Sequence, residues 1–172
     1  AGQDLYEEIN LVDKGGNYGW NIKEGKHCFD AANPETAPNS CVSTDADGNP
    51  LIDPVIEFEN SKNFSNGLGN VSVGGYVYSG TSVPSLNGKY IFGVLTQDPN
   101  GMNGAIFAAE RSGTTWNFSK IEFDDMDDGG LGMFVLGFGQ DNAGEVYVMT
   151  AGDAQASGKV FQIGERKSNT TP

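Results

Sequence analysis

Few residues of this chain have the types and spacing that chemistry requires. Cys28 and Cys41 are its two cysteines, and they flank a segment whose Asn, Pro and Ser content predicts a loop without periodic structure. A disulfide between them is plausible in an oxidising compartment. A zinc site is disfavoured because no second Cys/His pair stands at zinc spacing. His27, the sole histidine, is interpreted as a surface residue beside Cys28.

Two acidic stretches raise the question of cation binding. The run FDDMDDGG contains Asp124, Asp125, Asp127 and Asp128, and it fits either a cation site or an acidic loop. The stretch DADGNP (45–50) has part of the pattern of a calcium loop, but it lacks the downstream bidentate glutamate and is predicted to form an Asp-Gly turn. The sequence shows no nucleophile and base pair, no phosphate loop and no zinc motif. We therefore assign no catalytic residue.

The charge balance narrows the class of partners. The chain has 10 Lys and Arg against 23 Asp and Glu, which gives a net charge of -13. Phosphate backbones and anionic membrane faces would repel such a chain, so nucleic acid is excluded as a partner. The acidity fits a solvated surface, and it also fits a soluble, secreted or salt-adapted protein or one that holds divalent cations.

The ends and the hydropathy of the chain give two further expectations. No run approaches the ~20 apolar residues that a membrane span needs. The chain does not begin with Met and has neither a basic n-region nor an apolar h-region, so we interpret it as a processed product or a fragment.

Short runs rich in Val, Ile, Tyr and Phe recur between turn residues, and 25 glycines argue against long helices. These runs predict four consecutive strands followed by three more. The expected strands are 74–80, 88–95, 104–112 and 115–123, then 134–140, 144–151 and 158–165. Repeated units of four short antiparallel strands are typical of propeller blades.

The predicted fold is therefore all-β, a partial β-propeller of about two and a half blades of four-stranded antiparallel sheets over residues 1–172. An ordinary β-sandwich is the alternative, since about seven strands also satisfy it. An open propeller has unpaired strand edges, which would allow self-association or pairing with a complementary chain. The expected parts are the end of one blade and a long loop with Cys28 and Cys41 (1–60), one full blade (70–125), a last, incomplete blade (130–166) and a tail (167–172).

Three segments carry a resemblance to a known family: GQDLYEEINLVDKGGNYGWNIKEGKHC, GGYVYSGTSVPSLNGKYIFG and VLGFGQDNAGEVYVMT. Together they resemble the C-terminal half of the glucose/sorbosone dehydrogenase family. These are six-bladed β-propellers that include the soluble sugar dehydrogenases dependent on pyrroloquinoline quinone (PQQ). The stretch FGQDNAGEVYV, with a cysteine soon after the EG, is most similar to the hedgehog-interacting protein-like branch.

The resemblance implies a calcium site. Glu8, the glutamate of the EIN motif, and the backbone carbonyl of Tyr18 in NYGW stand at positions that resemble calcium ligands of the family. Calcium takes six to eight oxygen ligands and combines carboxylates with main-chain carbonyls. The alternative is that Glu8 is an ordinary strand residue beside Glu7. Cys28 stands where some relatives place a further acidic ligand.

The resemblance also implies a PQQ site, from which this chain departs. In the PQQ enzymes a second calcium bridges the cofactor through main-chain carbonyls that would fall at Gly2 and Gln3. The histidine base of those enzymes lies in an earlier blade, so this chain is expected to be inactive by itself. The family's Arg-x-Arg pair is missing, because no basic residue lies between Lys120 and Lys159. PQQ needs such cations for its carboxylates.

Two functions follow from the resemblance. In the first, the chain is the C-terminal portion of a PQQ-dependent sugar dehydrogenase-like propeller that oxidises sugars or small alcohols. In the second, it belongs to a non-enzymatic calcium-binding propeller that recognises a carbohydrate or protein partner. Both imply a secreted, periplasmic or cell-surface location.

Overall fold

The computed structural model describes residues 2–123, 130–153 and 157–165. In these ranges the chain forms β-strands and one short 3-10 turn, η1 (Pro84–Leu86). The strands are β1 (Tyr6–Ile9), β2 (Lys23–Glu24), β3 (His27–Cys28), β4 (Ile56–Glu59), β5 (Asn70–Val77), β6 (Tyr90–Thr96), β7 (Ala105–Ser112), β8 (Thr115–Lys120), β9 (Phe134–Gln140), β10 (Val146–Ala151) and β11 (Lys159–Gln162). No helix in the described ranges is long and apolar enough to cross a membrane.

The strands pair as antiparallel sheets, as the sequence predicts. Strands β5, β6, β7 and β8 form one four-stranded sheet in chain order, and β9, β10 and β11 form a three-stranded sheet. Strand β1 pairs with β4, and β2 pairs with β3 in a short hairpin. The prediction of an all-β chain with four strands followed by three is confirmed. Strand β5 begins at Asn70 instead of residue 74, because its pairing with β6 starts at Asn70 opposite Thr96 and continues past a register shift between Val73 and Tyr76.

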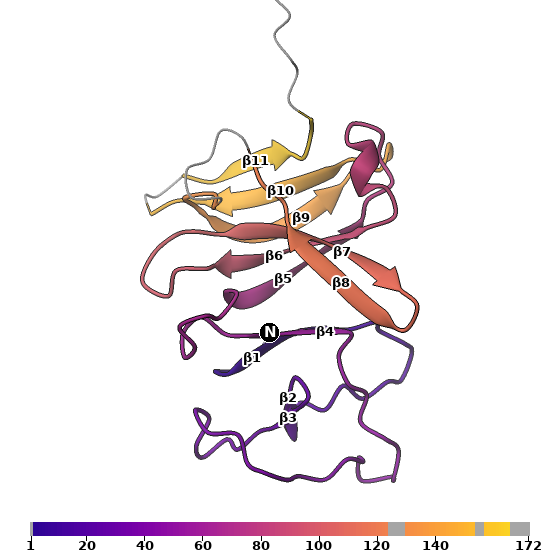
Figure 1. Cartoon of the computed structure of the whole chain (residues 1–172), viewed down its shortest axis with the longest axis vertical. Helices are drawn as coiled ribbons and strands as arrows, with labels where there is room; N and C mark the ends of the chain where they lie inside the picture. Colours follow the sequence, from indigo (N-terminus) through magenta and orange to yellow (C-terminus); the bar gives the residue numbers. More distant parts are fainter. Residues whose placement is uncertain (1, 124–129, 154–156, 166–172) are drawn as a thin grey trace, which may run out of the picture.

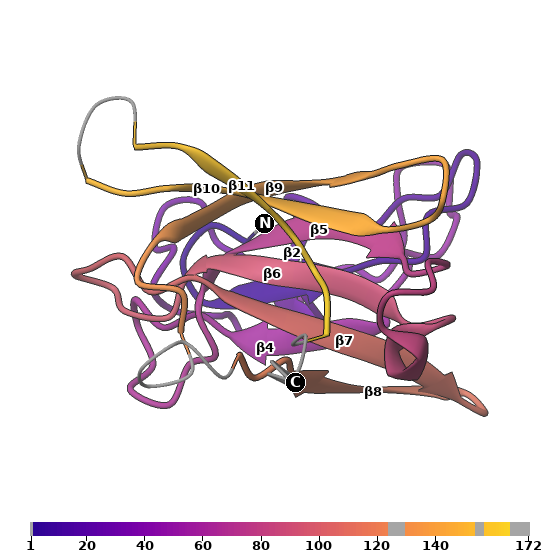
Figure 2. The ribbon, with the colours of Figure 1, turned by 90° about the horizontal axis from the view of Figure 1, so that it is seen from above.

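Three sheets stack in a row along the long axis of the molecule, with β5–β8 in the middle (Figure 1). The alternation of strand β6 explains this, because Ile91 joins the core against β9–β11 while Phe92 joins the core against β1 and β4. A two-sheet sandwich has a single core between its sheets, whereas here the middle sheet is covered on both faces. Seen from above, the sheets lie over one another (Figure 2), and this stack is compatible with consecutive blades of a partial propeller.

The two cores differ in their side chains. The core between β5–β8 and β1–β4 is aromatic, and the ring centroids of Phe92, Phe107 and Phe118 lie 5.3 to 6.0 Å apart. The core between β5–β8 and β9–β11 is mainly aliphatic, with Val135 and Val146 fully buried. In this core, Gly93 allows β6 to lie close to β9, because an added Cβ would be 3.1 Å from both Phe138 and Val135.

The segment FGQDNAGEVYV connects the last two sheets through Glu145. The hydroxyl of buried Tyr78 donates to Glu145 Oε2 (2.6 Å), and the backbone N–H groups of Thr81 and Ser82 donate to Oε1 (2.8 and 2.9 Å). These donors, led by the Tyr78 hydroxyl, lower the pKa of Glu145 from 4.5 to about 2. This carboxylate therefore fastens the chain after β5 to the turn before β10.

We expect this contact to make the fold acid-sensitive. The folded-state pKa of Glu145 lies below its ordinary value, so its contribution to stability is complete above pH 4.5 and is lost as the pH falls toward about 2. Urea unfolding midpoints of the wild type and Glu145→Gln, measured at about pH 6 and about pH 3, test this linkage. The wild type should lose more stability on acidification than the variant. Equal losses would contradict the assignment, and exposed Glu122→Gln serves as the control.

Candidate functional site

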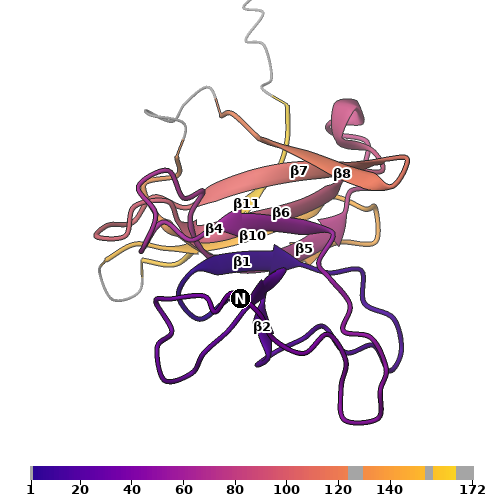
Figure 3. The same cartoon turned by 60° about the horizontal axis from the view of Figure 1, so that its bottom comes forward.

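Strand β1 lies beside β4 in a two-stranded sheet (Figure 3), and its adjacent glutamates, Glu7 and Glu8, project to opposite faces of that sheet. Glu8 lies opposite Glu57 of β4 in the strand register. Glu7 lies opposite Phe58 and faces the middle sheet, where it is completely buried. Alternation along a strand therefore separates two neighbouring carboxylates into two different environments.

Glu7 is fastened to the beginning of β5. The backbone N–H groups of Val71 and Ser72 donate to its two carboxylate oxygens (3.1 and 2.7 Å), and the Asn60 side-chain amide donates to Oε1 (3.0 Å). Val71 has a φ of 52°, which is uncommon for a β-branched residue. Successive backbone N–H groups around a left-handed residue can form an anion-binding concavity. Glu7 is thus a structural carboxylate that joins β1 to β5.

Glu8, the residue implied as a calcium ligand, is half-buried on the other face. Burial raises its pKa above the ordinary value, the Asn10 side chain lowers it by hydrogen bonding, and the carboxylates of Glu57 and Glu7 raise it. Its Oε2 atom is buried without a hydrogen-bond partner, and so is Oδ1 of Asn10. Oxygen atoms of this kind match the ligands that calcium prefers, so the residues present fit such an ion.

The surroundings of Glu8 are acidic and aromatic. Glu57 accepts a hydrogen bond from the backbone N–H of Lys26 and lies 3.3 Å from Nε2 of His27. The His27 ring stacks on Tyr6 with a centroid distance of 3.7 Å, and its side chain remains 40% exposed. His27 is therefore a surface residue in part, but it also covers the β1–β4 sheet.

The loop after β1 folds back through Tyr18, the second implied calcium ligand. The Tyr18 hydroxyl donates to the carbonyl of Leu11 (2.8 Å) and accepts from the N–H of Asp13 (2.6 Å). Gly19 follows with a φ of 93°, a conformation that favours glycine. In the described part of the chain, no hydrogen bond joins Tyr18 to Glu8. The role of the Tyr18 carbonyl remains a prediction.

Gly2 and Gln3, the implied PQQ-site positions, lie just before β1. The Gly2 N–H donates to Glu7 Oε2 (3.3 Å), and a Cβ at Gly2 would collide with the Tyr6 carbonyl and with Glu24. Gln3 is exposed. Buried Glu24 accepts hydrogen bonds from the backbone of residues 4 and 5 (2.7 and 3.0 Å), which fastens the β2–β3 hairpin to this segment.

The groups around Gly2 do not suit PQQ. Asp4, Glu7 and Glu24 are buried carboxylates, and the neighbouring Lys62 ammonium is paired with Asp4. A cofactor that carries several carboxylates requires fixed cations, and this corner of the structure presents anions instead. We therefore derive no chemical step through PQQ.

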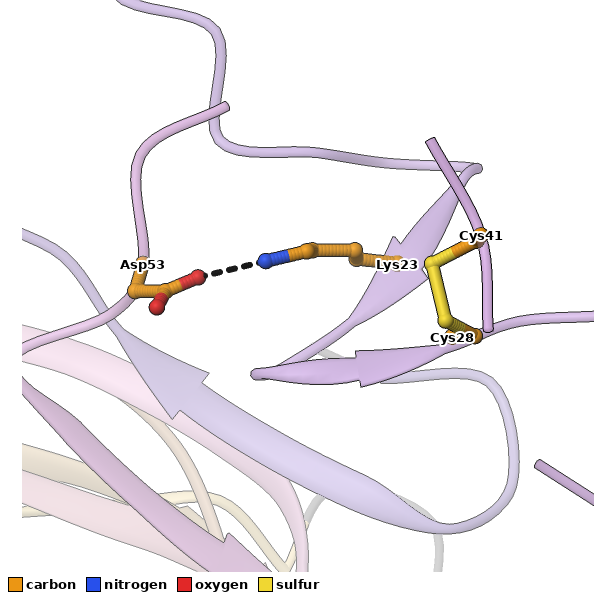
Figure 4. The surroundings of a disulfide bond; sticks show 4 residues. All are labelled: Lys23, Cys28, Cys41 and Asp53. Atoms are coloured by element: carbon orange, nitrogen blue, oxygen red, sulfur yellow. Dashed lines mark hydrogen bonds and ion pairs between the residues drawn. A yellow bond between two sulfur atoms is a disulfide. The ribbon is translucent and has the colours of Figure 1, made fainter. Parts of the chain in front are cut away.

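The disulfide expected from the sequence is present. Cys28 at the end of β3 bonds to Cys41, beside an ion pair between Lys23 and Asp53 (2.7 Å; Figure 4). The bond closes the loop that follows the hairpin. Part of the long segment before β4 is thereby covalently held to the hairpin.

The predictions for the two acidic stretches can be compared with the structure only in part. In DADGNP, Asp45 Oδ1 accepts from the N–H groups of Asp47 and Asn49 (3.0 and 2.9 Å), and Gly48 has a φ of 83°, so the predicted turn is confirmed. The run with Asp124, Asp125, Asp127 and Asp128 lies outside the described residues. Among the described residues, no group of three His, Cys, Asp or Glu side chains could hold a metal. A calcium site at Glu8 must therefore also use amide or backbone oxygens.

Sequence reasoning missed the structural carboxylates Glu7, Glu24 and Glu145. Each is at most 6% exposed and accepts backbone hydrogen bonds from a distant segment. One signal was available for Glu7, because two adjacent glutamates in an alternating strand must face opposite sides. The distant donors have no signature in sequence.

The sequence of the chain is similar to those of several known proteins. No protein-family model matches the chain. The HIPL1 protein of Arabidopsis thaliana is 32% identical over 162 residues, which are 88% of this chain and 22% of that protein. The HIPL2 protein of the same plant is 30% identical over 166 residues, with the same coverage. Hedgehog-interacting protein of Mus musculus is 30% identical over 125 residues, 69% of this chain and 16% of that protein. The chain spans about a fifth of the length of these curated relatives.

Proposed function

From this relationship to Hedgehog-interacting-like proteins, we propose that the chain is part of a non-enzymatic, calcium-binding β-propeller that recognises a protein partner outside the cytoplasm. The similarity to a protein named for its interaction with Hedgehog carries the proposal. A carbohydrate is the second candidate partner. The disulfide supports the location, because such bonds persist in oxidising compartments.

The calcium part of the proposal rests on Glu8. Its Oε2 atom is buried without a hydrogen-bond partner, which is costly for a carboxylate unless a cation or a proton compensates. Calcium binding would relieve that cost and would also reduce the repulsion between Glu8 and Glu57 across the β1–β4 pair. The ion would then stabilise the sheet. It would supply no chemistry to a substrate.

The charge pattern favours recognition over quinone chemistry. From residue 121 to residue 158 the sequence has neither Lys nor Arg. The buried charged side chains around Gly2 are carboxylates, and the neighbouring Lys62 is paired with Asp4. A PQQ-dependent sugar dehydrogenase would need fixed cations to hold the carboxylates of PQQ, and neither of these two places supplies one.

The last sheet offers a surface for association. Leu136, Met149 and Val160 are 41 to 66% exposed, and Met149 lies directly opposite Val160 in the pairing of β10 with β11. An apolar sheet face of this kind packs against another sheet or another protein. A further propeller blade, a second copy or a complementary chain would all satisfy it.

Binding measurements test the recognition proposal. The chain is immobilised and exposed, in calcium-containing buffer, to a purified Hedgehog protein and separately to a glycan array. Saturable binding of the Hedgehog protein that is weakened by a calcium chelator is the expected result. Binding to glycans alone would replace the protein partner by a carbohydrate. No saturable binding in either assay would contradict the proposal.

A further inference from the structure

Two buried oxygen atoms without partners belong to residues that stand two positions apart at the end of β1. Four buried side-chain polar atoms lack a hydrogen-bond partner among the described residues, and two of them are Glu8 Oε2 and Asn10 Oδ1. Residues two positions apart in extended chain project from the same face, so both oxygens belong to the face away from the middle sheet. Polar atoms buried in this way are rare and require an explanation.

The two side chains are near enough to affect each other. Burial raises the pKa of Glu8, and the side chain of Asn10 acts in the opposite direction as a hydrogen-bond partner of the carboxylate. An asparagine reaches a carboxylate with its amide N–H₂ group, which leaves its Oδ1 lone pairs free. The pair therefore presents one carboxylate oxygen and one amide oxygen, and neither atom accepts a hydrogen bond within the described part of the chain. These are two of the oxygen types that calcium binds.

The backbone that carries both residues is held in place on each side. The Ser72 hydroxyl donates to the carbonyl of Glu8 (3.2 Å), and the Val55 N–H donates to the carbonyl of Ile9 between the two side chains (3.0 Å). Buried Glu7 anchors the same strand to β5. Fixed ligands lose less conformational entropy when an ion binds, so this segment is suited to hold one.

Other oxygen atoms that could be calcium ligands already take part in hydrogen bonds. Both oxygens of Glu57 have partners, in the Lys26 N–H and the His27 ring. The Tyr18 hydroxyl is hydrogen-bonded within the loop after β1. Of the other three buried side-chain atoms that lack a partner in the described residues, Asn10 Oδ1 is the one on the same segment as Glu8.

We propose that Asn10 supplies, through Oδ1, a second side-chain ligand of a calcium site at Glu8. This inference rests on the proposed calcium-binding function and adds a ligand to the positions that the family resemblance implies. Because Asn10 is neutral, the site would have one negative charge fewer than a site with two carboxylate ligands. Aspartate has nearly the same shape as asparagine and carries a negative charge. We therefore expect that Asn10→Asp increases the calcium affinity.

Calorimetric titration of calcium into metal-stripped protein tests the assignment. Asn10→Ala should weaken binding about tenfold, and Asn10→Asp should tighten it about tenfold, since ligand number and charge set calcium affinity. Leu11→Asp is the matched control, because it adds the same charge one residue later at an exposed position. It should change the affinity by no more than about twofold. Thermal unfolding without calcium shows whether each variant folds.

The outcomes separate this inference from the function on which it rests. If the wild type binds calcium, Glu8→Gln abolishes binding and Asn10→Ala leaves it unchanged, the Asn10 assignment is overturned while calcium binding stands. The assignment also fails if Leu11→Asp tightens binding as much as Asn10→Asp does. If the wild type binds no calcium, the calcium-binding function fails, and the Asn10 assignment fails with it.

Discussion

Replacing Glu7 with alanine is expected to lower the free energy of unfolding by about 4 kcal/mol, because several buried hydrogen-bond donors lose their acceptor together. These donors include the backbone N–H groups of Val71 and Ser72 and the side-chain amide of Asn60. Without the carboxylate, the backbone at Val71, whose φ is 52°, loses hydrogen bonds that hold it in this uncommon conformation, and we expect the contact between β1 and β5 to loosen. Chemical denaturation followed by tryptophan fluorescence measures the loss.

Two comparisons make the Glu7 result interpretable. Glu59→Ala removes an exposed carboxylate from the same β1–β4 sheet and should cost less than about 1 kcal/mol. Glu7→Gln keeps one amide oxygen as an acceptor and should fall between the two. A Glu7→Ala variant as stable as Glu59→Ala would show that the carboxylate does not hold β1 against β5.

Reduction of the disulfide is expected to have the second largest effect. Cys28 and Cys41 are separated by 13 positions, and a closed loop of that size stabilises the folded state by about 3 kcal/mol on the chain-entropy model. The bond restrains the hairpin on which buried Glu24 lies, so its loss should also loosen the segment before β1. Unfolding curves with and without a thiol reductant measure the difference.

A double variant supplies the control for the disulfide. Cys28→Ser together with Cys41→Ser should be as unstable as the reduced wild type and should show no further change when reductant is added. Proteolysis should then cut the segment between these positions earlier than in the oxidised protein. Identical unfolding curves for oxidised and reduced wild type would show that this loop does not contribute to global stability.

The strands that the sequence predicted well are those with local signals. In β6 and β7, short apolar runs begin after glycine or asparagine turns, and their pairing partners follow directly in the chain. Strand β4 was not predicted, although IEFE alternates. It follows a long polar segment, and its partner β1 lies about fifty residues earlier. Pairing between distant strands leaves no local trace.

The features of the candidate site also divide into those with local sequence signals and those that depend on distant contacts. The disulfide and the Asp45 turn were predictable, because cysteine count and Asp-Gly chemistry act over short distances. The role of Glu7 was not, since its donors come from residues 71 and 72, and their geometry depends on the sheet stack. Glu8 was singled out by the resemblance, and its buried oxygen without a partner is a property that only the fold reveals.

The most direct measurement for the central claim combines calcium and PQQ on the same sample. Calcium is titrated calorimetrically into metal-stripped protein, and PQQ is then added while its absorbance spectrum is followed. We predict that calcium binds, that Glu8→Gln abolishes this binding, and that the PQQ spectrum does not change. Calcium-dependent docking of PQQ would contradict a non-enzymatic scaffold and would restore the sugar dehydrogenase interpretation.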